Sequence, residues 1–315
     1  MERARITVCC DLDLEKATNR AEQIAAYQGS VPRVTTDYQD VLADPDVDAI
    51  DLCTPPQFHM DEVVAAAQAG KHLACQKPLA RTLPECDAMI AAFEEAGKVL
   101  FYSEFFRTMT TAVAAKRVVD EGRIGEIVGI QATYAHWQGG VYLTTPWRYN
   151  PAVAGGGQLL DGGIHTLDIM HQVGGPVESV TCFTRRVRAE LGGEDTAVVN
   201  MRYAGGHLGT FMSTHAAGIY FPGPIVSVFG TKAILTIGGP FGGLTLHAPD
   251  LPDRREVLIA ERTDTFVSMI GHFLDVLEGV PSIATAQVGR DDLQLVLAAY
   301  RSAELGREVR LDEIL

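Results

Sequence analysis

The first hundred residues alternate short apolar segments with segments of helical periodicity, and this alternation limits the possible folds more than any other feature of the chain. Strands are expected at residues 5–10, 47–53, 72–75 and 99–102. Helices are expected at residues 13–27, 59–69 and 82–97. Thr82 and Glu85 have the spacing of a capping box, and Gly97 stands where that helix should end. Strands that alternate with such helices predict a parallel, doubly wound sheet.

After residue 124 the pattern changes to longer segments rich in Val, Thr, Ile and Tyr. These segments are 127–137, 177–187, 196–203, 207–214, 225–229 and 233–237. Turn residues such as Ala204-Gly205-Gly206 separate them, which indicates hairpins and a large, mainly antiparallel open sheet. Helices are expected at 110–121, 264–278 and 291–305. We therefore expect a parallel-sheet domain over residues 1–107 and an antiparallel-sheet domain over residues 108–315.

The second sheet has too little predicted helix to cover both of its faces. Apolar residues on the open face need a partner, so we expect a homodimer or homotetramer that forms through this sheet.

Composition excludes several classes of partner. The chain has 26 Lys and Arg against 40 Asp and Glu, a formal charge of -14, so neither nucleic acid nor a membrane surface is expected to bind. No apolar stretch is long enough for a membrane span, and no signal-peptide core follows Met1, so a cytoplasmic location is expected. The six cysteines include no C-x-x-C pair and are expected to be buried, reduced thiols.

Two polar runs contain candidate reactive groups. In GGGQLLDGGIH, Asp161 and His165 have i, i+4 spacing, so on a helix both project from one face, where they can share a proton or a substrate hydroxyl. Lys77, in AGKHLACQKPLA, would complete an acid/base trio. Asp168 and His171 add metal-ligand types to the same helix. The spacing i, i+4 and i+7 brings only Asp161, His165 and Asp168 to one side of the helix. No Cys or further His stands among them, so we expect no metal.

Together with the strand-end run CTPPQFH, these runs resemble the motifs of the Gfo/Idh/MocA family, which includes glucose-fructose oxidoreductase and inositol dehydrogenase. The three signatures occur in the family's order, and the resemblance spans nearly the whole chain. It implies a Rossmann-like first domain, NAD or NADP as cofactor, and oxidation or reduction of a ring alcohol in a sugar, cyclitol or similar polyhydroxylated substrate. It also implies that Lys77, Asp161 and His165 are catalytic: His165 takes the hydroxyl proton, Lys77 holds the oxygen, and Asp161 orients the imidazole or binds a neighbouring hydroxyl.

The resemblance implies further binding residues. Those expected at the cofactor are Asp11, Thr54, Pro55, His59 and Gln76, with Asp11 at the adenosine ribose. Those expected at the substrate are Glu104, Arg107, Trp147, Arg148 and Tyr149. Two alternatives stay open. The position of His59 is equally compatible with a local cap at the start of a helix, and the loop with Trp147, Arg148 and Tyr149 is equally compatible with packing against its own domain.

One departure from the family pattern concerns the nucleotide. Family members begin with a strand, a G-x-G-x-x-G turn and a helix, whereas residues 5–11 already resemble the second strand and the sequence contains no G-x-G-x-x-G. That loop holds the dinucleotide pyrophosphate, so we expect NAD(P) to bind weakly or not at all. The strand at 5–10 should pair with 47–53 or leave a gap in the sheet, unless Met1 is not the native start.

The departure leaves two rival functions open. One is a cofactor-independent acid/base enzyme on the same scaffold, such as a lyase, dehydratase, epimerase or bond-cleaving enzyme. The other, a non-catalytic binding protein, has no chemical need for the Lys77, Asp161 and His165 trio.

Overall fold

The computed structural model describes residues 3–137, 145–238, 242–261 and 265–314. Its first part alternates strands and helices as the sequence predicts. The elements are β1 (Val8–Cys10), α1 (Leu14–Gln28), β2 (Arg33–Thr35), α2 (Tyr38–Leu42), β3 (Ala49–Leu52), α3 (Pro56–Gln68), β4 (His72–Gln76), α4 (Leu83–Ala96) and β5 (Leu100–Ser103). The short β2 and α2 were not predicted.

The parallel strands form two separate sheets. β1 pairs only with β2, and β3, β4 and β5 form a second sheet in that order. Of the two outcomes expected for the first strand, the structure therefore has the gap rather than a direct β1–β3 pair. Cys10 at the end of β1 and Cys53 after β3 are exposed, so the expectation of buried thiols is wrong for these two because no strand covers them.

A nine-stranded sheet occupies the second part of the chain, in the order β13-β12-β11-β10-β6-β9-β8-β7-β14. Its strands are β6 (Ile127–Ala135), β7 (Val177–Arg185), β8 (Thr196–Tyr203), β9 (Leu208–Thr214), β10 (Val226–Gly230), β11 (Ile234–Ile237), β12 (Gly242–His247), β13 (Glu256–Glu261) and β14 (Val309–Arg310). All neighbours are antiparallel except β6 and β9, which confirms the predicted fold class. β12, β13 and β14 were not predicted.

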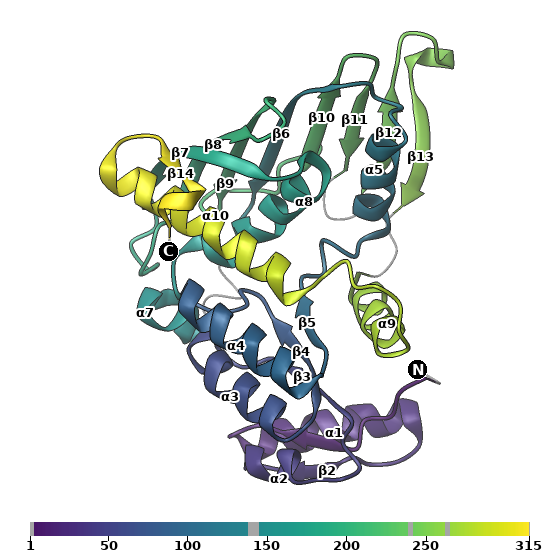
Figure 1. Ribbon diagram of the computed structural model, residues 1–315, viewed down its shortest axis with the longest axis vertical. Helices are drawn as coiled ribbons and strands as arrows, with labels where there is room; N and C mark the ends of the chain where they lie inside the picture. Colours follow the sequence, from purple (N-terminus) through teal and green to yellow (C-terminus); the bar gives the residue numbers. More distant parts are fainter. Residues whose placement is uncertain (1–2, 138–144, 239–241, 262–264, 315) are drawn as a thin grey trace.

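Helices cover one face of this sheet. The helical elements are α5 (Thr110–Asp120), η1 (Pro146–Tyr149), α7 (Pro151–Ala154), the π-helical turn η2 (Leu159–Gly163), α8 (Ile164–Gly174), η3 (Pro252–Arg254), α9 (Thr265–Leu277), α10 (Ala286–Leu305) and η4 (Leu311–Glu313). Figure 1 shows α5, α8 and α10 on the same side of the strands. Among the described residues no helix packs on the opposite side, so that face stays open.

Local capping explains where several helices begin and end. Thr82 and Glu85 form the predicted capping box of α4, and Gly97 ends that helix in the left-handed conformation, with φ +62°. α10 begins five residues earlier than expected because the Thr285 hydroxyl accepts a hydrogen bond from Val288 N and so caps it there. α3 begins at Pro56, since proline is well suited to the first helical position.

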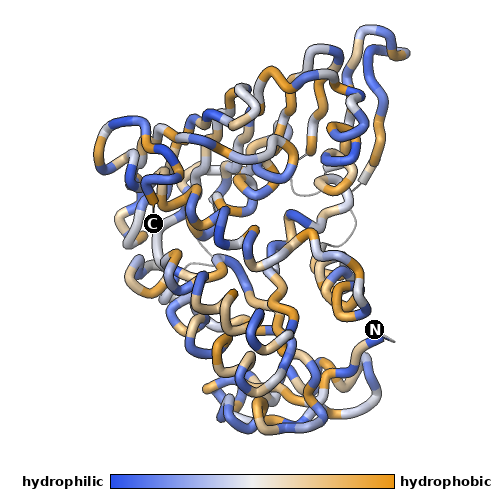
Figure 2. Tube along the Cα trace, viewed as in Figure 1, coloured by the Kyte–Doolittle hydropathy of each residue, from blue (hydrophilic) through white to orange (hydrophobic). Residues whose placement is uncertain are grey.

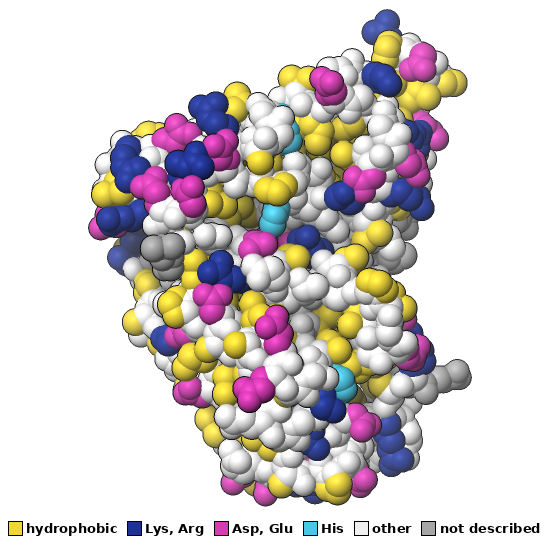
Figure 3. Space-filling model, in the orientation of Figure 1, with side chains coloured by type: hydrophobic (Ala, Val, Ile, Leu, Met, Phe, Trp, Pro, Cys, Tyr) yellow, Lys and Arg dark blue, Asp and Glu magenta, His cyan; other side chains and the backbone are white. Residues whose placement is uncertain are grey.

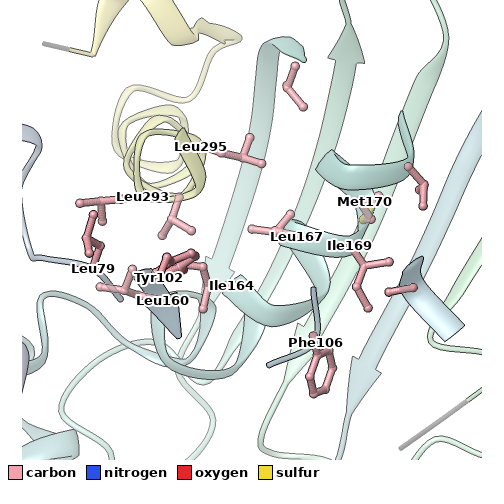
Figure 4. Close-up of a cluster of buried hydrophobic side chains, with 14 of the residues drawn as sticks. Leu79, Tyr102, Phe106, Leu160, Ile164, Leu167, Ile169, Met170, Leu293 and Leu295 are labelled. Atoms are coloured by element: carbon pink, nitrogen blue, oxygen red, sulfur yellow. The ribbon is translucent and has the colours of Figure 1, made fainter. Parts of the chain in front are cut away.

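A shared hydrophobic core joins the two parts of the chain. Leu293 and Leu295 of α10 lie between Leu167 of α8 on one side and, on the other, Leu79 in the segment after β4 and Tyr102 of β5 (Figure 4). Because Leu79 follows Lys77 by two residues, this packing fixes the position of the Lys77 turn.

Polar and apolar residues are distributed as in an ordinary globular protein. Figure 2 shows hydrophilic and hydrophobic residues alternating along α3, α4 and α10, and Figure 3 shows acidic and basic side chains interspersed over the visible face. Within the described ranges, no helix is long and apolar enough to cross a membrane.

Candidate functional site

Lys77 and Asp161 meet where the parallel sheet adjoins η2. Lys77 directly follows β4, and its Nζ lies 3.1 Å from Asp161 Oδ1 and also donates to the Asp161 carbonyl oxygen. Their side chains are only 10% and 15% exposed. Water therefore competes little for this ion pair, which joins residues 84 positions apart in the chain.

Asp161 carries a second cation, Arg148, whose Nη1 donates to Asp161 Oδ1. Burial raises the pKa of Asp161, but the Lys77 and Arg148 cations outweigh burial and hold that pKa well below its usual range. Arg148 was expected to bind substrate and is instead engaged by Asp161, with its guanidinium 4.5 Å from the centroid of the Trp147 ring. The side chain of Tyr149 lies outside the described residues.

His165 lies in the first turn of α8 and is buried. Its Nδ1 is 2.7 Å and 2.8 Å from the two carboxylate oxygens of Glu104. Burial lowers the pKa of His165, while Glu104 partly opposes that change, so the imidazole is neutral near pH 7. Glu104 is fully buried behind the ring. In this structure Glu104 contacts His165, and its expected place at the substrate stays a prediction.

Arg107 was also predicted to bind substrate, and its side chain contacts other residues of the protein. Its Nη1 donates to Asp168 Oδ1 and its Nε donates to the Ile283 carbonyl oxygen at 2.6 Å. Arg107 is buried, at 8% exposed, and both of these contacts are with other parts of the protein. Because Asp168 follows His165 by three residues, the segment 104–107 contacts α8 at two successive points.

His59 holds the Lys77 turn from behind. Its Nδ1 lies 3.1 Å from the carbonyl oxygens of Pro78 and Leu79, and its Nε2 lies 2.8 Å from the Thr54 carbonyl oxygen. The ring is fully buried. Of the two interpretations that the sequence left open, these contacts favour the local one, and a role of His59 at the cofactor stays a prediction.

The glycine-rich run does not form the regular helix that the i, i+4 argument assumed. Asp161 lies in the π-helical turn η2, and His165 begins α8. Glu194 contacts the start of η2. Its Oε1 accepts a hydrogen bond from Leu159 N and its carbonyl oxygen accepts one from Gln158 N, both at 2.8 Å. The wider turn directs Asp161 to Lys77 while His165 contacts Glu104.

Three aromatic residues beside Asp161 were missed. The His136 and His215 ring centroids are 4.6 Å apart, and Tyr134 lies 4.7 Å from His136. A Cβ on Gly162 would lie 2.7 Å from His215 Nε2, so this glycine allows the rings to approach the turn that carries Asp161. Burial and the neighbouring His136 lower the pKa of His215 to about 3. No spacing in the sequence links these residues to Asp161.

The residues at the end of β1 fit a nucleotide only in part. Asp11 is exposed, as a ribose ligand requires, but the Asp13 carboxylate accepts the Glu15 and Lys16 N–H groups at the start of α1. These N–H groups are of the kind that binds a pyrophosphate in nucleotide-binding folds, and the nearby acidic side chains repel phosphate. The residues present therefore do not fit a pyrophosphate at α1.

The remaining predicted cofactor residues offer little more. The Thr54 hydroxyl donates to Glu62, Pro55 is the N-cap of α3, and Gln76 is half-buried next to Lys77. No metal-binding group of three or more His, Cys, Asp or Glu side chains occurs in the part of the chain that the structure describes.

A parallel α/β sheet, a large antiparallel sheet and a buried Lys–Asp pair at their junction define a two-part α/β protein. Two family models match the chain: the GFO/IDH/MocA C-terminal domain over residues 112–236, and the oxidoreductase family, NAD-binding Rossmann fold, over residues 3–104. The chain therefore belongs to the Gfo/Idh/MocA oxidoreductase family, which confirms the resemblance seen in its motifs.

Several relatives are similar over most of their length. A 1,5-anhydro-D-fructose reductase from Ensifer adhaerens is 29% identical over 309 residues, which are 93% of this chain and 89% of that protein. A myo-inositol 2-dehydrogenase from Thermotoga maritima is 28% identical over 295 residues, 90% of this chain and 86% of that protein. The solved structure of an oxidoreductase from Agrobacterium radiobacter in complex with NAD+, L-tartaric acid and magnesium has a TM-score of 0.83 at 26% identity, covering 98% of this chain and 92% of its own.

Proposed function

We propose that this chain acts on a ring hydroxyl of a sugar, cyclitol or similar polyhydroxylated substrate, with Lys77, Asp161 and His165 as its acid/base centre. The observation that carries the proposal is the 3.1 Å contact of Lys77 with Asp161, made from separate elements, with His165 one helical turn further on. Relatives that are, by name, a sugar reductase and a cyclitol dehydrogenase support the substrate class.

The roles of the three residues follow from their surroundings. His165 is neutral because burial lowers its pKa, so it can accept the proton that leaves the hydroxyl. The Lys77 ammonium stabilises the negative charge that develops on the same oxygen. Asp161 holds that ammonium in place through its carboxylate and its carbonyl oxygen.

The hydride half of a redox reaction needs NAD or NADP, as in the family. Asp11 is the candidate ribose ligand, but the sequence contains no G-x-G-x-x-G turn to hold the pyrophosphate. We therefore derive only the proton transfer from the residues of this chain, and we propose weak nucleotide binding.

The missing glycine motif favours a second candidate function. Elimination, epimerisation or bond cleavage beside a carbonyl needs only proton transfers, which Lys77 and His165 can perform without a nucleotide.

One experiment tests both candidates. Purified protein is assayed against a panel of aldoses, aldonates and cyclitols with NAD+, with NADP+ and with neither, following both nucleotide absorbance and product formation. We expect Lys77→Met and His165→Asn to lower turnover by about a hundredfold. His247→Asn, on β12 and bonded to Thr236, is the control and should behave as wild type.

Each outcome selects among the functions. Turnover only with nucleotide supports the dehydrogenase, and turnover without it supports the proton-transfer enzyme. Near-normal turnover in both variants would show that the acid/base assignment is wrong.

The open face of the nine-stranded sheet supports a proposed assembly. Leu208 and Met212 of β9 and Phe183 of β7 are exposed there, at 54%, 43% and 73%. The broad hollow on this face includes an exposed ion pair, Arg202 with Glu308 at 3.3 Å, and lies away from Lys77 and Asp161, so we assign it to a second copy of the chain rather than to substrate. Light scattering should report a dimer or tetramer at micromolar concentration, and Leu208→Glu with Met212→Glu should give a monomer.

We also propose that the chain divides functionally after residue 107. Residues 1–107 contain the five parallel strands, and residues 108–315 contain the nine-stranded sheet with Asp161 and His165.

A further inference from the structure

The segment from Glu104 to Phe106 surrounds the His165 ring on three sides. Glu104 contacts Nδ1 with both carboxylate oxygens. The Phe106 ring stacks on the imidazole at a centroid distance of 4.9 Å, and the Phe105 ring meets it edge-on at 4.8 Å. These contacts leave the ring one orientation, in which Nε2 points away from Glu104.

The chemistry of the carboxylate determines which ring nitrogen carries the proton. An ionised carboxylate only accepts hydrogen bonds, so the nitrogen facing it must be the N–H donor. Glu104 Oε1 also accepts the Phe106 backbone N–H at 2.9 Å, which holds the carboxylate still. Since Glu104 is fully buried, water does not replace either contact.

We infer that Glu104 is a positioning residue that holds neutral His165 with its proton on Nδ1, so that the Nε2 lone pair is the proton acceptor of the site. This inference rests on the proposed acid/base role of His165 and assigns Glu104 a task different from substrate binding. It also predicts that the Glu104 carboxylate stabilises the imidazolium that forms once Nε2 has taken the proton.

The charges around His165 determine the sign of the expected change. Burial and the Lys77 ammonium lower the pKa of His165, whereas Glu104 and Asp161 raise it. His215, on the segment after β9, is a further titratable neighbour, and burial keeps it neutral. Removing the Glu104 charge must therefore lower the pKa of His165, by roughly one to three units for an opposite charge at this range.

The test is nitrogen-15 NMR of histidine-labelled full-length protein, which needs neither substrate nor nucleotide. The His165 signals are identified as those that disappear in His165→Gln. In the wild type at pH 8 we expect Nδ1 to be protonated and Nε2 to be unprotonated. In Glu104→Gln we expect the pKa to fall by at least about one unit and the Nε2–H form to appear, because the new amide can donate to Nδ1.

Two further variants separate positioning from a general structural role. Glu104→Asp keeps the charge and should return the pKa of His165 close to the wild-type value. Asp292→Asn removes a buried carboxylate from another histidine of α8, since Asp292 lies 3.1 Å from His171 Nδ1, and should leave the His165 titration unchanged.

The inference is overturned if wild-type His165 carries its proton on Nε2, or if Glu104→Gln leaves both its tautomer and its pKa unchanged. The wild-type measurement decides even if the variants fold poorly. The outcome of this NMR measurement does not depend on the proposed function. The proposed function fails separately if His165→Asn turns over substrate at the normal rate.

Discussion

Arg107 and Asp168 form a buried ion pair, and Arg107→Met should show how much the protein depends on it. The Arg107 side chain is 10% exposed and that of Asp168 is fully buried. The substitution leaves a buried carboxyl group without its cation, which costs about 3–5 kcal/mol of unfolding free energy. For a unit of about 200 residues that cost lowers Tm by roughly 6–20 °C.

The loss of stability in Arg107→Met should become larger as pH rises. Burial and the neighbouring Asp292 carboxyl group raise the pKa of Asp168, and Arg107 opposes them. Without Arg107 the folded-state pKa rises further above the unfolded value of about 3.9. The folded protein then keeps a proton that the unfolded chain releases, so stability falls as pH rises above about 4. The Tm difference between variant and wild type should be larger at pH 8 than at pH 4.5.

Thermal unfolding followed by circular dichroism at the two pH values provides the measurement. Arg107→Lys keeps the positive charge but loses the planar group that reaches both Asp168 and the Ile283 carbonyl oxygen, so its Tm should be intermediate. Adding Asp168→Asn to Arg107→Met should recover part of the loss. A Tm within about 2 °C of wild type at pH 8, or a deficit that grows toward acid, would refute the reasoning.

Gly157→Ala should prevent correct folding or lower Tm sharply, because its Cβ would lie 2.1 Å from Glu194 Oε2 and 2.4 Å from the Glu194 carbonyl oxygen. Gly271 lies inside α9 with open space around it, so Gly271→Ala should instead stabilise the protein by about 0.5–1 kcal/mol in the same thermal unfolding experiments. An equal fall in Tm in both variants would disprove the steric argument. Thr82→Ala removes the α4 capping box and should cost about 1 kcal/mol in urea unfolding, and an unchanged midpoint would show that the cap is not needed. Calorimetric titration with NADH and NADPH should give weak binding or none, since the sequence contains no G-x-G-x-x-G turn, and ordinary micromolar affinity would show that other residues hold the pyrophosphate.

Local features of the chain could be predicted because they depend on neighbouring residues. The capping box at Thr82 and the stop at Gly97 are satisfied within one turn of backbone. The period-2 pattern of 196–203 reflects one buried and one exposed face, and it predicted β8 correctly. The strand β12, which lies between β11 and β13, was missed because Gly242 and Gly243 interrupt its apolar pattern.

The arrangement of the candidate site depends on contacts between distant parts of the chain. The Asp161 and His165 spacing indicated a shared helical face, but Asp161 lies in a π-helical turn, whose first N–H groups are bound by Glu194, 29 positions after His165 in the sequence. Glu104 looked like a substrate ligand until the fold placed it behind His165, 61 residues away in the chain.

By itself the sequence determined most of the longer helices and strands and which residue types the site contains, because periodicity and capping act over a few residues. The tertiary structure alone decided the partner of each polar side chain. Lys77 pairs with Asp161, Arg148 with Asp161, and Arg107 with Asp168. A buried polar group must find a partner wherever the packed elements bring one within reach, and that proximity is a property of the assembled fold.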